Sequence, residues 1–81
     1  MTVKITLAET LERLKTEGKP MTKNAIAVEA KTRPSTLSDL ASGNSKAIKI
    51  ETLNDILNAM NRLQPNENFT ITDIIDYVRE D

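Results

Sequence analysis

Cysteine and histidine are both missing from this chain of 81 residues. Without cysteine, neither a disulfide nor a thiolate metal site can hold the fold. Without histidine, the chain lacks the commonest metal ligand and the commonest general base near neutral pH. An all-oxygen metal site would need a dense carboxylate loop, and the sequence has none. A nucleophile–base pair and a phosphate-cradling loop are also missing. We therefore expect no metal, no cofactor and no catalytic residue, which makes an enzyme the least favoured class.

Long apolar runs are missing as well. No stretch approaches the roughly 18 apolar residues that are needed to span a membrane. Residues 1–14 lack the apolar run and small-residue cleavage site of a signal peptide. These absences predict a cytoplasmic protein without membrane association. The length leaves room for one domain around one compact core, so we expect a single domain over residues 1–81.

The charges are unevenly distributed, although the formal net charge is only −1. Residues 15–49 contain seven basic and three acidic side chains, whereas residues 50–81 contain two basic and seven acidic ones. Such an asymmetry suggests one face for a polyanion and another face that is kept away from it. The alternative is that both are ordinary solvated surfaces.

The spacing of apolar residues predicts five short helices. The first begins at Leu7 and is stopped by Gly18, and the fifth follows a Thr70 cap. The second, third and fourth are expected over about residues 23–30, 34–42 and 50–62. The stripe of the fifth helix is Ile71, Ile74, Ile75 and Val78. We expect all these stripes to be core, with little room left for a ligand and no small-molecule substrate.

Two short segments alternate apolar and polar residues, which is typical of strands. They are the N-terminal arm at residues 2–6 and, more weakly, residues 69–71. We expect the arm to pair with residues 69–71 as a two-stranded ribbon, either within one chain or between chains. An isolated ribbon is marginally stable, so it would need packing against the helices.

The central segment carries the functional information. Thr22 suits the cap of the second helix, Pro34 suits the first position of the third, and Gly43 closes it. Only about three residues join these two helices, which forces them to cross steeply, as in a helix-turn-helix. The order of small, apolar and polar positions over Met21–Gly43 resembles the Cro/cI-like (XRE family) repressors.

The resemblance extends over most of the chain. It continues through Ile50-Glu51-Thr52-Leu53 and Ala59-Met60, and more loosely through Leu7–Glu17 and Thr70–Tyr77. It implies an all-α, five-helix lambda-repressor-like domain that binds operator DNA and regulates transcription as a repressor.

The chain departs from the family pattern at the turn between the two helices. Lys31 stands where the family usually has glycine, at a position that tends to need left-handed backbone. Thr32 replaces a usual hydrophobic residue, and Arg33 replaces a usual serine cap, so the third helix loses a good cap.

The resemblance also assigns roles by position. The start of the second helix would contact phosphate, and the third would lie in the major groove against base edges. The DNA-binding residues implied in this way are Thr22, Lys23, Lys31, Arg33, Pro34, Ser35, Thr36, Ser38, Asp39, Asn44 and Lys46. Basic side chains would neutralise phosphates, while short hydroxyls would form hydrogen bonds with bases or touch thymine methyl groups. The recognition positions lack Arg, Gln and Asn, which predicts modest direct readout and a larger part for DNA shape.

One helix-turn-helix reads only a few base pairs, so we expect a homodimer whose copies lie about 34 Å apart along the DNA. The C-terminal part is the expected pairing segment, because it is acidic and holds more apolar surface than one docked helix needs. The expected interface residues are Leu63, Phe69, Ile71, Ile74 and Tyr77.

A second class of function stays open. The chain could be a protein-interaction module, such as an antitoxin or anti-regulator whose helices cap a partner protein, with its acidic C-terminal third in that role. In that case Ser35, Thr36 and Ser38 would be ordinary polar groups of a first helical turn. Lys46 and Lys49 would then be solvated loop charges.

Overall fold

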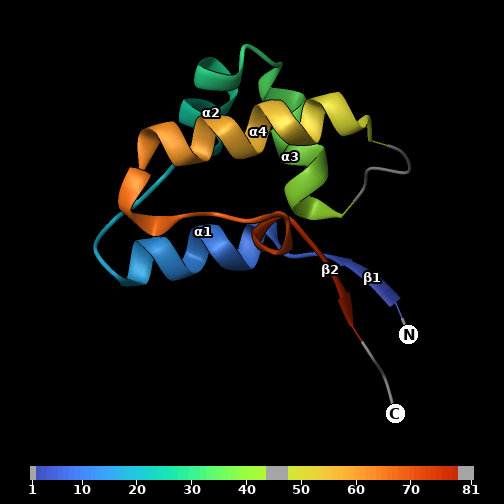
Figure 1. Cartoon of the computed structure of the whole chain (residues 1–81), viewed down its shortest axis with the longest axis horizontal. Helices are drawn as coiled ribbons and strands as arrows, with labels where there is room; N and C mark the ends of the chain where they lie inside the picture. The colour runs from blue at the N-terminus through green and yellow to red at the C-terminus, as the bar shows by residue number, and fades with distance from the viewer. Residues whose placement is uncertain (1, 44–47, 79–81) are drawn as a thin grey trace.

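The computed structural model describes residues 2–43 and 48–78. In this part of the chain, four α-helices follow one strand and precede a second one along the sequence, and the two strands lie side by side (Figure 1). The elements are β1 (Thr2–Ile5), α1 (Leu7–Thr16), α2 (Lys23–Ala30), α3 (Pro34–Ser42), α4 (Ile50–Leu63), the 3₁₀ turns η1 (Pro65–Glu67) and η2 (Ile71–Asp73), and β2 (Ile75–Val78). The four helices therefore match the first four that the sequence predicts.

Local chemistry explains where the helices start and stop. The Thr22 hydroxyl accepts a hydrogen bond of 3.0 Å from the Ala25 N–H and so caps α2. Pro34 occupies the start of α3, where its missing N–H costs nothing. Beyond α1 and α3 the backbone turns left-handed, at Gly18 (φ +75°) and Gly43 (φ +78°), a conformation that glycine adopts without steric cost.

The core lies where the four helices meet. α2 packs against both α3 and α4, and α1 contacts α3. The largest side chains that are fully buried are Leu7, Leu14, Ile26, Leu37, Leu40, Ile56, Met60 and Ile74. Each such side chain stabilises the fold by about 1.5–3 kcal/mol relative to an exposed one. None of the described helices is long and apolar enough to cross a membrane.

The prediction of a fifth α-helix is wrong. Residues 71–73 form only the short turn η2, and the chain then extends as β2. Ile74 and Ile75 still face the core, but Ile75 and Tyr77 follow the two-residue period of a strand. Over eight residues rich in β-branched side chains, the helical and strand periods fit almost equally well, and pairing with the N-terminal arm decides for the strand.

The expected ribbon exists within the chain, although its second strand was misplaced. β1 pairs antiparallel with β2, not with residues 69–71. In this register Val3 is opposite Tyr77, and Ile5 is opposite Ile75. Ile5 and Ile75 pack against the helical core, which supplies the support that a two-stranded ribbon needs. Val3 and Tyr77 lie on the same face of the ribbon but extend beyond the core and are exposed.

Side-chain hydroxyls tie the C-terminal segment to the start of α1. Thr10, which is buried, donates its Oγ1 hydrogen to the Asp73 carbonyl at 2.7 Å. Thr6 donates similarly to the Thr72 carbonyl at 2.6 Å, and its N–H donates to the Ile74 carbonyl at 2.8 Å. These three bonds fix η2 beside α1 and so set where the ribbon leaves the helical body.

Candidate functional site

The outer face of α3 is polar and exposed. Leu37 and Leu40 point into the core, so residues at spacings of three and four on the opposite side face solvent. This outer face consists of Ser35, Ser38, Asp39 and Ser42. Ser42 was not among the residues expected to bind DNA, although its spacing from Ser35 and Ser38 could have identified it.

Two other expected recognition residues lie at the start of α3. Pro34 is exposed, whereas Thr36 is half-buried on the flank of the helix. The Thr36 N–H donates to the Arg33 carbonyl at 3.0 Å, within the first turn. Thr36 therefore has a packing role that the exposed Ser35 does not share.

The turn between α2 and α3 has a left-handed residue at position 31, where the resemblance implies one although this chain has lysine in place of glycine. Lys31 has φ +57° and ψ +40°. The Thr32 N–H donates to the Ala27 carbonyl at 2.9 Å, which satisfies a carbonyl near the end of α2. Arg33 makes no side-chain cap for α3, which confirms that this helix lacks a good cap. The turn thus keeps the backbone of a glycine stop with a lysine in its place.

An arginine from α4 holds the end of α2. The Arg62 Nε donates to the Glu29 carboxylate at 2.7 Å, and its Nη2 donates to the Glu29 backbone carbonyl at 3.1 Å. Because Glu29 directly precedes the last residue of α2, this contact anchors the helix next to the turn. Sequence reasoning missed it, since nothing local links two residues 33 positions apart.

Three expected phosphate-binding side chains are exposed around this surface. Lys23 begins α2, and Lys31 and Arg33 flank the turn. Within residues 2–43 and 48–78, none of these three forms an ion pair. By contrast, Lys19 pairs with Glu67 at 3.1 Å. Asn44 and Lys46, also expected to bind DNA, lie outside the described residues.

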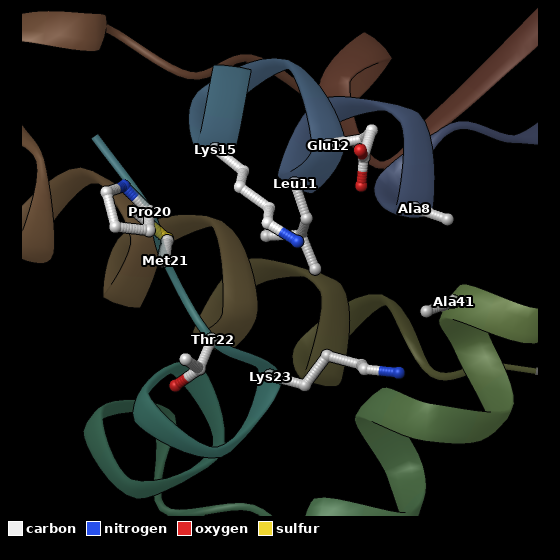
Figure 2. A pocket seen from close by; sticks show the side chains of 9 residues that line it. All are labelled: Ala8, Leu11, Glu12, Lys15, Pro20, Met21, Thr22, Lys23 and Ala41. Carbon is white, nitrogen blue, oxygen red and sulfur yellow. The ribbon is translucent and has the colours of Figure 1, made fainter. Parts of the chain in front are cut away.

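A cleft of about 530 Å³ opens beside this surface, between α1, the start of α2 and α3 (Figure 2). The cleft lies at the surface, where Gly18 to Thr22 carries the chain away from α1 and the small residues Ala8 and Ala41 line the wall. The expectation that the apolar stripes leave little room for a ligand stays a prediction. The lining residues are Ala8, Leu11, Glu12, Lys15, Pro20, Met21, Thr22, Lys23 and Ala41.

The expected dimer interface does not form one surface. Phe69 is only 5% exposed and Ile74 is fully buried, so both belong to the core of a single chain, and placing them at an interface was wrong. Leu63, Ile71 and Tyr77 are exposed. However, Leu63 ends α4 and Tyr77 lies in β2, and Figure 1 shows these two segments on opposite sides of the molecule.

Neither a known protein family, a curated protein nor a solved structure matches this chain.

Proposed function

We propose that this chain is a Cro/cI-like, sequence-specific DNA-binding regulator that inserts α3 into the major groove of operator DNA. The observation that carries the proposal is the pair α2 and α3, joined by three residues through a left-handed Lys31. This pair exposes the polar outer face of α3, and the exposed basic residues Lys31 and Arg33 directly precede that helix. A helix presented in this way can enter the major groove, which admits one α-helix.

Phosphate binding would come from the ends of α2 and the turn. Lys23, Lys31 and Arg33 carry charges that no carboxylate within the described residues neutralises through an ion pair. The first N–H groups of α2 add a partial positive charge next to Lys23. Contacts of this kind set affinity and orientation but carry little sequence information.

Base recognition would come from the outer face of α3. Hydroxyls such as those of Ser35 and Ser38 can donate to or accept from base edges, and the Asp39 carboxylate can accept from the amino group of cytosine. None of these side chains makes the bidentate contact that arginine makes with guanine. We therefore expect specificity to rest partly on DNA shape and deformability.

The regulator would act as a homodimer, because one α3 covers too few base pairs for a specific site. Two copies on one face of the DNA would place their recognition helices about 34 Å apart. A chain with a net charge of only −1 can approach DNA because its basic side chains are concentrated in residues 15–49.

The decisive experiment selects binding sites from random DNA with the pure protein and then titrates the best site at two salt concentrations. Lys23→Ala and Arg33→Ala should weaken specific and random DNA alike. Each should flatten the slope of log affinity against log salt by about 0.9 per lost phosphate contact. Arg13→Ala is the matched control, since it removes one positive charge from α1, where Arg13 lies within 3.9 Å of Glu17 and does not line the cleft.

A chain that selects no sequence, and whose residual DNA binding is the same in all three variants, would overturn the proposal. That result would favour the interaction module, an antitoxin or anti-regulator whose helices cap a partner protein.

A further inference from the structure

The cleft beside α2 combines an apolar floor with two lysines. Leu11, Met21 and Ala41 are buried or half-buried and form apolar lining. Figure 2 shows the Lys15 amine and the Leu11 side chain projecting from α1 into the cleft, with Lys23 running along the facing wall. A volume of about 530 Å³ lies within the range of about 300–1,000 Å³ that is usual for small-molecule sites.

The charges around the cleft favour an anion at one end of it. Lys15 and Lys23 form no ion pair within the described residues, so neither amine is neutralised by a neighbouring carboxylate. The start of α2 adds the positive end of the helix dipole, where the Thr22 hydroxyl already accepts from the Ala25 N–H. Glu12 is the one carboxylate in the lining, and it lies one helical turn from Lys15 toward Ala8. An anionic group is thus favoured at the lysines and disfavoured near Glu12.

We propose that this cleft binds a small amphipathic organic anion, with its apolar body on Leu11, Met21 and Ala41 and its charged group between Lys15 and Lys23. The ligand would share Lys23 with the proposed phosphate contacts, so ligand and DNA would exclude each other. The anion site stands on the cleft alone, whereas its role as an inducer rests on the proposed function.

The test uses decanoate as the probe, below its micellar range, with the full chain labelled with ¹⁵N. Decanoate should give saturable amide shifts confined to residues 8–15, 21–23 and 41. Decyltrimethylammonium, which has the same tail and the opposite charge, should bind several-fold more weakly. Equal binding of the two probes would overturn the proposal, as would shifts centred on the exposed ribbon residues Val3 and Tyr77.

Substitutions in and beside the cleft distinguish a specific binding site from nonspecific hydrophobic binding. Lys15→Gln and Lys23→Gln should each weaken decanoate binding by about two- to five-fold, and Glu12→Gln should tighten it by a similar factor. Arg13→Gln, on the other flank of α1, should leave it unchanged. Ala8→Met, at an exposed position of the wall, should fill the cleft and weaken binding without touching a charge. Equal affinity across these variants would overturn the site.

The proposed role of the ligand as an inducer is tested separately, through its effect on DNA binding. At a decanoate concentration of ten times its dissociation constant, simple competition should lower the apparent affinity for DNA by about tenfold for each chain bound. For a site that binds two chains, the fall should therefore be about a hundredfold. If the chain binds DNA but decanoate leaves that affinity unchanged, the inducer role fails while the proposed function stands. If decanoate binds in the cleft of a chain that selects no DNA, the proposed function fails while the anion site stands.

Discussion

Lys31 is a position where the proposed DNA binding and the stability of the fold would favour different residues. Its backbone is left-handed at φ +57°, where a residue with a Cβ is strained by roughly 1–2 kcal/mol. Its side chain is exposed beside the start of α3 and carries a charge toward the proposed phosphate surface. A glycine would remove the strain and the charge together, which makes the position a direct probe of the proposed function.

We therefore expect Lys31→Gly to raise stability and lower DNA affinity. Relief of the left-handed strain, less the extra entropy of an unfolded glycine, should stabilise the fold by about 0.5–1 kcal/mol. Thermal unfolding measures the first effect, and DNA titration at two salt concentrations measures the second. Lys31→Asn tolerates the same backbone and also removes the charge, so it should bind DNA as weakly as the glycine variant. Wild-type DNA affinity in both variants would remove Lys31 from the interface.

Ser35 is the sharpest residue for testing recognition, because it is exposed and has no packing role. Ser35→Ala should cost about 1–3 kcal/mol at one operator position and little on random DNA. Thr36→Ala, at a half-buried position, should in addition lower thermal stability. Affinities measured on a panel of single-base operator changes locate the effect. A loss that is uniform across the panel would mean that α3 does not read bases through this face.

At the scale of elements, Asn61 determines the path of the chain after α4. Its side-chain Nδ2 donates to the Phe69 backbone carbonyl at 3.1 Å, and its side-chain Oδ1 accepts from the Phe69 N–H at 2.7 Å. Both bonds are partly buried. They hold the backbone of Phe69 while its ring, only 5% exposed, fills the core.

Asn61→Ala should lower the free energy of unfolding by about 2–3 kcal/mol, because it leaves two partly buried backbone groups without partners. Asn58→Ala, on the exposed side of the same helix, is the control and should change it by less than about 0.5 kcal/mol. Denaturant unfolding measures both. If the two variants unfold alike, the Asn61 bonds do not hold the 64–70 segment in solution.

Features that depend on residues close in the sequence could be predicted, whereas features that depend on distant contacts could not. Thr22, Pro34 and Gly43 act on their own helix ends, so α2 and α3 could be placed from sequence. The strand β2 could not, because its identity depends on a partner strand whose paired residues are 70 or more positions away. Phe69 was misjudged for the same reason: its burial results from the turn after α4 and the Asn61 bonds, which no local pattern encodes. The exposure of Ser35 and Ser38 follows from helical period alone, whereas the cleft depends on how three helices meet.

At the scale of the whole molecule, the ribbon offers a surface for pairing two copies. Ile5 and Ile75 pack on the core, but on the same face Val3 is 63% and Tyr77 is 57% exposed. Within the described residues, β1 and β2 pair only with each other, so each strand keeps an unpaired edge. An apolar face next to open strand edges would be covered if a second copy packed against it. Leu63, which is exposed on the opposite side of the molecule, is the alternative position for a dimer interface.

We expect sedimentation equilibrium to find a dimer of the wild type at micromolar concentration, and a monomer of Tyr77→Asp. An aspartate at this exposed position would bury a charge in the dimer but leave the fold of one chain intact, as circular dichroism should confirm. Leu63→Asp is the control and should remain dimeric; a monomeric Leu63→Asp beside a dimeric Tyr77→Asp would move the interface to the end of α4. Phe69→Asp cannot serve here, because Phe69 is core and its replacement should unfold the chain. A wild type that stays monomeric and binds only single half-sites would exclude the homodimer altogether.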